Sequence, residues 1–479
     1  MAFGKYASIN SLAEKVHHLV ENGELDQALR LIHHFVEQII TEPLCTAQVF
    51  GSKVLDDLCQ LIGQENLKQI KPHHIDLPAT PNDQSTIVYM VTKLQKSGGH
   101  TRVIEDFIKS EPEARHIILS TELDGPSDAD YLKNQNLPSE IIFEQSAKLN
   151  YQQRLTWLQH SLLKLRPTKV YLFNHHQDSI AVAAIQPEMQ LDAIFYHHGD
   201  HHLCLGVYLS YFKHIDPHPM GYHNCRNILN IENTYIPLTA EDKGRRPTDW
   251  SFMPDGTLTT CTAGRSNKIE IPYFVSYLEL IPKLLATTGG KHIHIGRLTP
   301  WALYKLRQGL KKHNVQPDRF VYIEWVPSVW KSLHDYRIDL YIASFPYGGG
   351  LTLVEAMGAG IPVALHRHIY SKLLSCIELG YPNAFNWRFP EELISYCKSI
   401  TVTELQNASH LARLQYDQFH SNNFELRKQD CPSAVDSVSN QFTVETDEWA
   451  YWMERQLTVK RLLLRALYRA FKRFRTWWQ

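Results

Sequence analysis

Apolar side chains near the amino end recur every three or four positions, as at Leu12, Val16 and Leu19. That spacing places them on one face of a helix. Asn22-Gly23 interrupts the pattern, and a second apolar face follows from Leu25 onward. We therefore predict a helical N-terminal domain over residues 1–75.

Beyond a proline-containing linker the pattern changes to short apolar runs that alternate with amphipathic stretches. This alternation is typical of parallel sheets covered by helices. It predicts an α/β fold of two Rossmann-like domains, at residues 85–240 and 255–425, facing across a cleft. In open sheets of this kind, ligands bind at the carboxyl ends of the strands. The predicted strands are residues 86–91, 116–120, 169–173 and 191–196 in the first domain, and 258–262, 292–295, 320–323, 340–343 and 362–364 in the second.

The chain is predicted to be helical again from about residue 385, and residues 440–479 form a last predicted domain of C-terminal helices. Its tail, residues 456–479, carries seven cations, and no acidic residue follows Glu454. Leu463, Leu467 and Phe471 share one helical face, with the cations opposite. This pattern favours an amphipathic helix on an anionic membrane surface. Packing against the protein and a nucleic-acid patch are the alternatives.

Composition narrows the class of protein. Lys and Arg (49) nearly balance Asp and Glu (50), so a protein coated with positive charge for nucleic acid is not expected. The hydrophobic share of 43% excludes a wholly disordered chain. None of the eight cysteines forms a CxxC pair, and neither a signal peptide nor a run of about 20 apolar residues is visible. We expect a protein of the cytoplasm, with the tail on the inner face of the membrane.

A glycine-rich turn in the second domain lies between a predicted strand and a helix. Gly349, Gly350, Leu351 and Thr352 stand at this junction. Glycine permits close backbone approach, and a helix N-terminus offers free N–H groups and a positive dipole end, which suits a diphosphate. Glu355, one turn into the helix, could accept hydrogen bonds from a ribose. The alternative is a turn that only packs strand against helix.

Basic residues follow the first predicted strand of the same domain. Gly264, Arg265 and Lys268 lie in this loop. Arg can clamp phosphate with two hydrogen bonds, and Lys acts as a point charge. Trp325 follows a later predicted strand. Solvated loop cations and hydrophobic packing are the alternatives.

In the first domain, a Gly-Gly turn follows the first predicted strand. Gly98 and Gly99 would permit a ligand to approach the backbone closely, and His100 and Arg102 follow them directly.

A run of polar and flexible residues, 197–202, follows the strand predicted at 191–196. Asp200, His201 or His198 could take a proton from an acceptor hydroxyl, as could His100. A metal held by His198, Asp200 and His202, beside the stretch 174–178, is the less favoured interpretation. The pair Asp128 and Asp130 is interpreted as a solvated loop.

The stretch FPYGGGLTLVEAMGAGIPV resembles the donor-binding segment of GT-B glycosyltransferases, both the retaining bacterial group with an E-x7-E motif and the O-GlcNAc-transferase/SPINDLY-like group. Glu355 matches the second Glu of E-x7-E, whereas Tyr347 stands at the first. Inversion is favoured, although the stereochemical outcome stays open. HHGDHHLCLG is similar to an Asn-His-Ala-Asp-His…Leu-Gly pattern of bacterial surface-polysaccharide glycosyltransferases and points to Asp200 and His201.

The resemblance implies a glycosyltransferase that moves a sugar from a nucleotide-diphosphate donor, with UDP favoured, to a hydroxyl acceptor. It also implies that Gly98 and Gly99 form the acceptor-side loop, which faces the sugar and phosphates across the cleft with His100 and Arg102. Trp325 would occupy the region that holds the nucleobase in this fold. The acceptor would be a glycan or lipid-linked precursor of the bacterial cell surface, of capsule or lipopolysaccharide. Neither a metal nor another cofactor is expected. A protein glycosyltransferase that recruits its substrate through residues 11–70, a non-catalytic adaptor and a sugar-nucleotide epimerase remain as alternatives.

Overall fold

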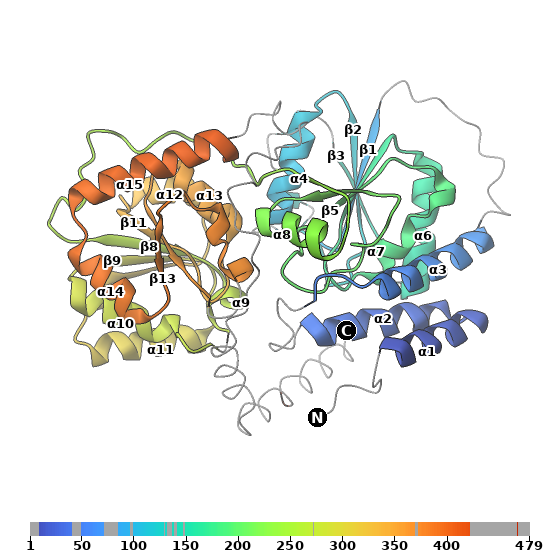
Figure 1. Cartoon of the computed structure of the whole chain (residues 1–479), viewed down its shortest axis with the longest axis horizontal. Helices are drawn as coiled ribbons and strands as arrows, with labels where there is room; N and C mark the ends of the chain where they lie inside the picture. Colours follow the sequence, from blue (N-terminus) through green and yellow to red (C-terminus); the bar gives the residue numbers. More distant parts are fainter. Residues whose placement is uncertain are drawn as a thin grey trace. The chain divides into compact units, whose positions relative to one another are not determined.

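The computed structural model describes residues 9–40, 49–70, 85–95, 99–128, 130–131, 137, 141–146, 149–271, 273–368, 372–421 and 467. The chain divides into two compact units, and among the described residues the boundary falls between Leu238 and Thr239. Figure 1 labels their helices and strands. No helix in these ranges is both long and apolar enough to cross a bilayer. The C-terminal domain predicted at 440–479 lies outside the described residues, except for Leu467.

The described part of unit 1 contains a seven-stranded parallel sheet of order β3-β2-β1-β4-β5-β6-β7. The Rossmann-like character predicted for residues 85–240 is confirmed by this parallel sheet, but three of its strands were not predicted. β3 is a half-exposed edge strand, and β6 and β7 carry polar side chains that the fold buries or pairs, so none reads as an apolar run. The strands are β1 (Thr86–Val91), β2 (Arg115–Ser120), β3 (Ile141–Gln145), β4 (Lys169–Phe173), β5 (Ala193–Tyr196), β6 (Lys213–Asp216) and β7 (Asn233–Tyr235).

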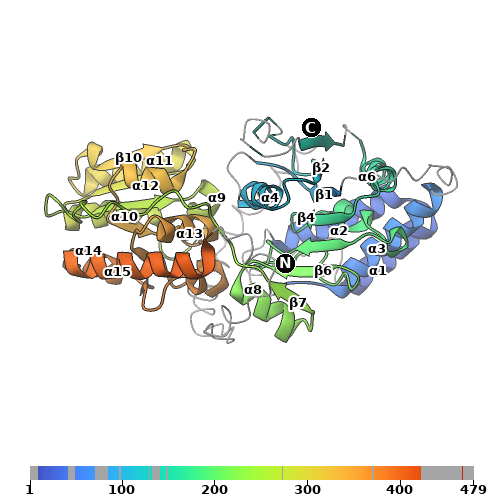
Figure 2. The ribbon, with the colours of Figure 1, turned by 90° about the horizontal axis from the view of Figure 1, so that it is seen from above.

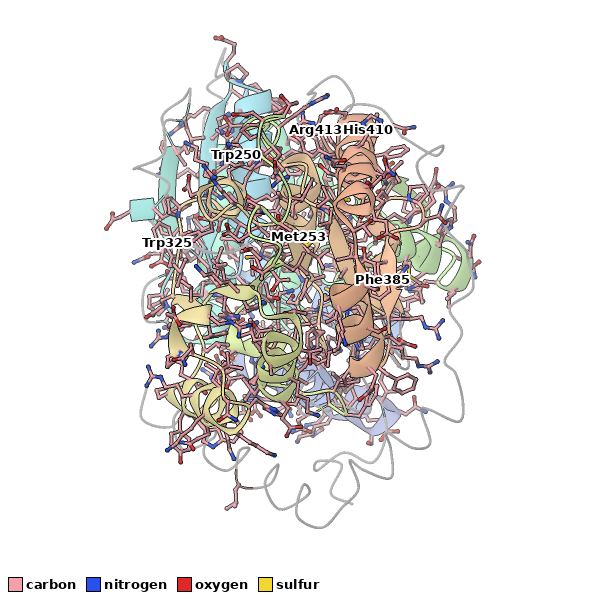
Figure 3. The ribbon with its side chains drawn as sticks, turned by 90° about the vertical axis from the view of Figure 1, so that its left-hand side faces the viewer. Trp250, Met253, Trp325, Phe385, His410 and Arg413 are labelled. Atoms are coloured by element: carbon pink, nitrogen blue, oxygen red, sulfur yellow. The ribbon has the colours of Figure 1, made fainter. Side chains whose placement is uncertain are left out.

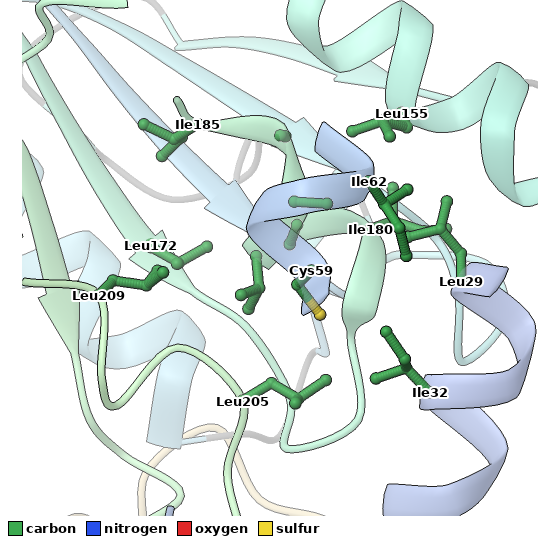
Figure 4. Packing of buried hydrophobic residues seen from close by; sticks show 14 of the residues in the cluster. Leu29, Ile32, Cys59, Ile62, Leu155, Leu172, Ile180, Ile185, Leu205 and Leu209 are labelled. Atoms are coloured by element: carbon green, nitrogen blue, oxygen red, sulfur yellow. The ribbon is translucent and has the colours of Figure 1, made fainter. Parts of the chain in front are cut away.

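Both faces of this sheet are buried, which explains the continuous apolar character of β1. Tyr89 packs in a cluster with Ile104 and Ile108 of α4 (Gly99–Ser110). Val88 and Met90, which point to the opposite face, belong to a larger cluster. That cluster includes residues of α6 (Tyr151–Leu165) and α7 (Ser179–Ala184), and Figure 4 shows part of it.

The three N-terminal helices complete this larger cluster. They are α1 (Ile9–Glu21), α2 (Leu25–Ile40) and α3 (Lys53–Ile70), and in Figures 1 and 2 they lie together beside the sheet. Leu29 and Ile62 are fully buried in the same core as Val88. A Cβ on Gly63 would meet the Ala183 carbonyl oxygen at 1.9 Å, so α3 touches α7 backbone to backbone. The helices predicted as a separate domain thus share their core with the sheet.

The described part of unit 2 contains a six-stranded parallel sheet of order β10-β9-β8-β11-β12-β13. β13 was not foreseen, because the chain was expected to be helical from about residue 385. Figure 3 labels Trp325, just after edge strand β10, and Phe385, on edge strand β13, at opposite sides of the unit. The strands are β8 (Thr259–Ala263), β9 (Lys291–Ile295), β10 (Phe320–Ile323), β11 (Leu340–Ile342), β12 (Val363–His366) and β13 (Phe385–Trp387).

Two helical layers accompany the unit 2 sheet. In one, α10 (Tyr277–Thr288) packs against α11 (Pro300–Lys312) and α14 (Pro390–Ser399). In the other, α13 (Gly350–Gly358) packs against α12 (Val329–Asp335) and α15 (Val402–Gln415). Two short helices, α8 (Pro219–His223) in unit 1 and α9 (Ser266–Ile269) in unit 2, lie in the loops that contain the candidate sites.

Candidate functional site

The glycine-rich loop of unit 2 is pinned by hydrogen bonds between β11 and α13. The Ser344 hydroxyl donates to the Tyr347 carbonyl at 2.8 Å, and the Gly348 N–H donates to the Leu374 carbonyl at 2.7 Å. A Cβ on Gly348 would lie 2.6 Å from the Ser375 carbonyl oxygen. Glycine is therefore a steric requirement of this loop.

The Thr352 hydroxyl makes two hydrogen bonds that stabilise the first turn of α13. Its hydroxyl donates to the Gly349 carbonyl at 2.9 Å and accepts from the Tyr341 hydroxyl at 3.0 Å. The side chain is thus engaged in holding Gly349, the N-cap of the helix. The N–H groups of Gly350 and Leu351, at the start of the helix, have no acceptor inside it. The backbone rather than the Thr352 hydroxyl is what the loop offers to an anion.

Lys268 reaches the same loop from α9. Its ammonium group donates to the Gly348 carbonyl, although the side chain is only half-buried. Burial, followed by the neighbouring Arg265, lowers the pKa of Lys268, while Cys376 acts in the opposite direction. A partly desolvated cation beside a helix N-terminus gains from an incoming anion.

Arg265 and Gly264 connect β8 to this arrangement. Arg265 is the half-buried N-cap residue of α9. A Cβ on Gly264 would lie 2.9 Å from the Cβ of Ser344, so the loops after β8 and β11 are in direct contact. The predicted residues Gly264, Lys268 and Gly349 therefore converge.

Two other predicted donor residues, Glu355 and Trp325, lie on α13 and after β10. Glu355 is half-buried on α13, three residues after Thr352. Trp325 follows β10 and is 42% exposed. Both are located on the loops and helix that the prediction named, and their contacts with a nucleotide stay predictions.

In unit 1, histidines from three strand ends gather. The ring of His100, on α4, lies 3.3 Å from the ring of His198 and 5.5 Å from that of His175, measured between centroids. Burial lowers the pKa of His100 to about 3 and that of His198 well below its ordinary value. Both imidazoles are therefore neutral near pH 7.

The other predicted residues of the first glycine turn lie at the start of α4. Gly99 begins the helix, and a Cβ there would meet no atom within 4 Å. Arg102 pairs with Glu105 at 3.1 Å on the same helix. Gly98 lies outside the described residues. Gly99 is thus not required by packing.

Asp200 is buried and held by two histidines. Its Oδ2 accepts a hydrogen bond from His218 Nδ1 at 2.8 Å, and its Oδ1 lies 3.6 Å from His201 Nδ1. Burial alone raises the pKa of Asp200, but His218 and His201 lower it by more, so it lies well below its usual range. A carboxylate already stabilised in its charged form is a weak proton acceptor. His201, whose side chain is 36% exposed, is more accessible than Asp200, the other residue predicted to act as the base.

The N-terminal helices brace the loops that carry these histidines. Asp56 of α3 accepts the N–H groups of Gly206 at 2.7 Å and Tyr208 at 2.9 Å, just beyond the histidine run. His33 of α2 donates through Nδ1 to the Gln177 carbonyl at 3.0 Å, in the loop after β4. Residues 11–70, which the sequence analysis considered for substrate recruitment, thus contact the candidate site directly.

Sequence reasoning missed two participants in the unit 1 cluster. His218 follows β6, which had not been predicted, so nothing indicated that it approaches Asp200. His175 Nδ1 pairs with Asp124 Oδ2 at 2.5 Å, across loops after β4 and β2. The polar run 174–178 was a usable signal for His175, whereas Asp124 had none.

Comparisons with known proteins identify the fold. No family model matches the chain, and no curated protein matches it. Among solved structures, it is similar to a glycosyltransferase from Rickettsia africae, with a TM-score of 0.54 and 14% identity over 72% of this chain and 97% of that one. The lipopolysaccharide outer core galactosyltransferase WaaB gives a TM-score of 0.53 and 16% identity over 74% and 99% of the two chains.

A third similar structure is HepE from Anabaena in complex with UDP and glucose, with a TM-score of 0.52 and 13% identity over 74% of this chain and 100% of that one. The predicted fold is therefore confirmed: two parallel-sheet α/β units with the GT-B glycosyltransferase fold.

Proposed function

We propose that this GT-B chain is a glycosyltransferase that moves a sugar from a UDP-sugar to a hydroxyl acceptor in the synthesis of a bacterial cell-surface glycan. HepE, a structural neighbour, was solved with UDP and glucose, and WaaB is a lipopolysaccharide galactosyltransferase. These similarities support the choice of UDP and of a surface glycan. Capsule and lipopolysaccharide both fit.

The observation that carries the proposal is the convergence of Lys268 and the N-terminus of α13 on Gly348 and Gly349. The diphosphate oxygens would accept hydrogen bonds from the backbone N–H groups of the glycine loop. Lys268 and Arg265 would neutralise the negative charge that develops as the UDP leaving group departs. Glu355 would bind the ribose, and Trp325 the uracil. In this proposal the cations Lys268 and Arg265 neutralise the leaving group, so transfer needs no metal ion.

On the acceptor side, His201 is our proposed general base. Asp200 would orient its imidazole through Nδ1, which leaves Nε2 to accept the hydroxyl proton. His218 makes the shorter contact to Asp200, at 2.8 Å against 3.6 Å, and is the competing base. His201→Gln should lower turnover by about 10²–10⁴-fold, with UDP affinity unchanged. If His218→Gln has that effect and His201→Gln does not, the assignment passes to His218.

Calorimetric titration with UDP tests the donor site. Loss of one charge-assisted contact of about 1.5–3 kcal/mol should weaken UDP binding by roughly ten- to a hundredfold in Lys268→Met. Lys312→Met, an exposed lysine at the end of α11, is the matched control and should bind UDP normally. No binding of UDP by the wild-type protein, with binding of GDP or TDP, would replace the proposed base.

The two alternatives to this function differ in turnover. A non-catalytic adaptor would bind UDP-sugar without releasing UDP in the presence of any acceptor or of water. A protein glycosyltransferase would label peptides rather than glycan acceptors. UDP release with glycan, lipid-linked and peptide acceptors therefore separates all three.

We further propose that transfer takes place in the cytoplasm, on the inner face of the membrane. The charge pattern of residues 456–479 supports it, with seven cations opposite a Leu/Phe face.

A further inference from the structure

Four side chains with metal-ligating atoms meet inside unit 1, apart from the residues assigned to transfer. His197 follows β5, His214 and Asp216 lie on β6, and Cys225 lies in the turn after α8. None is more than 5% exposed. One ligand atom from each lies within 4.8 Å of all the others.

The separations fit tetrahedral coordination. Bonds of about 2.0–2.1 Å to nitrogen and about 2.3 Å to sulfur place neighbouring ligand atoms roughly 3.3–3.7 Å apart around Zn²⁺. His197 Nδ1 lies 2.9 Å from Asp216 Oδ1 and 3.4 Å from Cys225 Sγ, and that sulfur lies 3.6 Å from Asp216 Oδ1. A shift of a few tenths of an ångström admits the ion, which would displace both the proton between His197 and Asp216 and the thiol proton of Cys225.

His214 supplies an independent indication of a ligand. Its Nε2 lies 3.2 Å from Asp216 Oδ2 but makes no hydrogen bond to any described residue. The side chain is only 4% exposed, so solvent does not compensate. A buried polar atom without a hydrogen bond destabilises the folded state, and a metal bond would remove that penalty.

Asn233 supports the carboxylate from outside. Its side-chain amide donates to Asp216 Oδ2 at 2.6 Å and to the Tyr222 carbonyl at 2.9 Å. Hydrogen bonds of this kind orient ligating carboxylates in metal sites.

We propose that His197, His214, Asp216 and Cys225 bind one Zn²⁺ ion as a closed structural site. Two imidazoles, a carboxylate and a thiolate are ligands that Zn²⁺ accepts, and four protein ligands leave no open position for chemistry. The ion would join the end of β5, β6 and the turn at Asn224–Ile228, with His197 as the first residue of the histidine run. The sequence analysis expected no metal, so this site departs from it.

Metal analysis of untagged full-length protein, produced with zinc in the medium, tests the site. We expect about one zinc per chain, and after replacement by Co²⁺ a thiolate-to-cobalt charge-transfer band with intense visible bands of tetrahedral geometry. Cys225→Ser should lose the charge-transfer band. Cys204→Ser, which alters a buried thiol outside the four ligands, should keep it.

A second histidine group, His33, His34 and Glu37, could hold metal at the surface of α2. His34→Gln removes it and should leave the zinc content unchanged. Zinc below about one tenth of an equivalent after reconstitution, or zinc that disappears with His34→Gln, overturns the proposal. Should Cys225→Ser fail to fold, the wild-type cobalt spectrum decides, because a metal without a thiolate ligand shows no such band.

Discussion

Asp56 is the residue through which α3 holds the backbone that follows the histidine run. It is 1% exposed, and its two oxygens accept the N–H groups of Gly206 and Tyr208. In Asp56→Asn the side chain keeps its shape, but one of the two oxygens becomes an amide N–H₂ group. That group faces a backbone N–H, so one buried donor loses its acceptor. The expected loss of stability is about 1–3 kcal/mol.

Thermal unfolding measures this loss. For a unit of 150–250 residues, 1 kcal/mol corresponds to roughly 2–4 °C in Tm, so the variant should melt about 2–12 °C lower. Asp57→Asn is the matched control on the same helix. The Asp57 side chain is 59% exposed and pairs with Lys53 at 2.7 Å, an exposed pair worth about 0.3–0.5 kcal/mol. Its Tm should change by no more than about 2 °C.

Sugar transfer by the same variants tests the functional side of the argument. Asp56 holds a loop of unit 1, whereas the proposed donor loop belongs to unit 2, so turnover should fall in Asp56→Asn while UDP affinity stays unchanged. Equal Tm values for the two variants would refute the bracing contact. A lower Tm with undiminished turnover, at a temperature where the variant is folded, would show that the contact does not position the histidines.

The remaining predictions concern the titration of Asp56, the glycine loop and the tail. Burial, partly offset by the Gly206 and Tyr208 N–H groups, raises the pKa of Asp56 to about 7 from 3.8. The native state therefore holds a proton that the unfolded chain releases, so wild-type stability should fall as pH rises from about 4 to 7, and Asp56→Asn, followed by urea unfolding, should lack this slope. Gly349→Ala would place a Cβ 2.6 Å from the Thr352 hydroxyl oxygen, and calorimetry should show UDP binding at least about tenfold weaker with Tm nearly unchanged; normal affinity would remove the loop from the donor site. Deletion of residues 456–479 should abolish binding to anionic liposomes at low salt, and wild-type protein that ignores such liposomes would contradict the membrane assignment.

The sequence alone was sufficient for the two-unit α/β architecture and for the position of the glycine-rich loop between β11 and α13. A strand that is buried on both faces, such as β1, is apolar along most of its length. A continuous apolar run of this kind is visible within a few consecutive residues of the sequence. The glycine-rich loop is also a local feature, because strand, glycines and helix follow one another within residues 340–358. Gly264 and Lys268 were located by the same rule, because they follow the first strand of their sheet.

The tertiary structure decided the contacts between residues far apart in the chain. Asp56 and Gly206 are 150 positions apart, and no periodicity connects them. β6 escaped prediction because His214 and Asp216 are polar, and the Asp216 carboxylate is tolerated inside the protein because it accepts hydrogen bonds from His197 and Asn233. For the same reason the approach of His218 to Asp200, and the meeting of His197 with Cys225, depend on sheet order. Local pattern determines which elements form, whereas the pairing of buried polar groups is determined only when those elements pack.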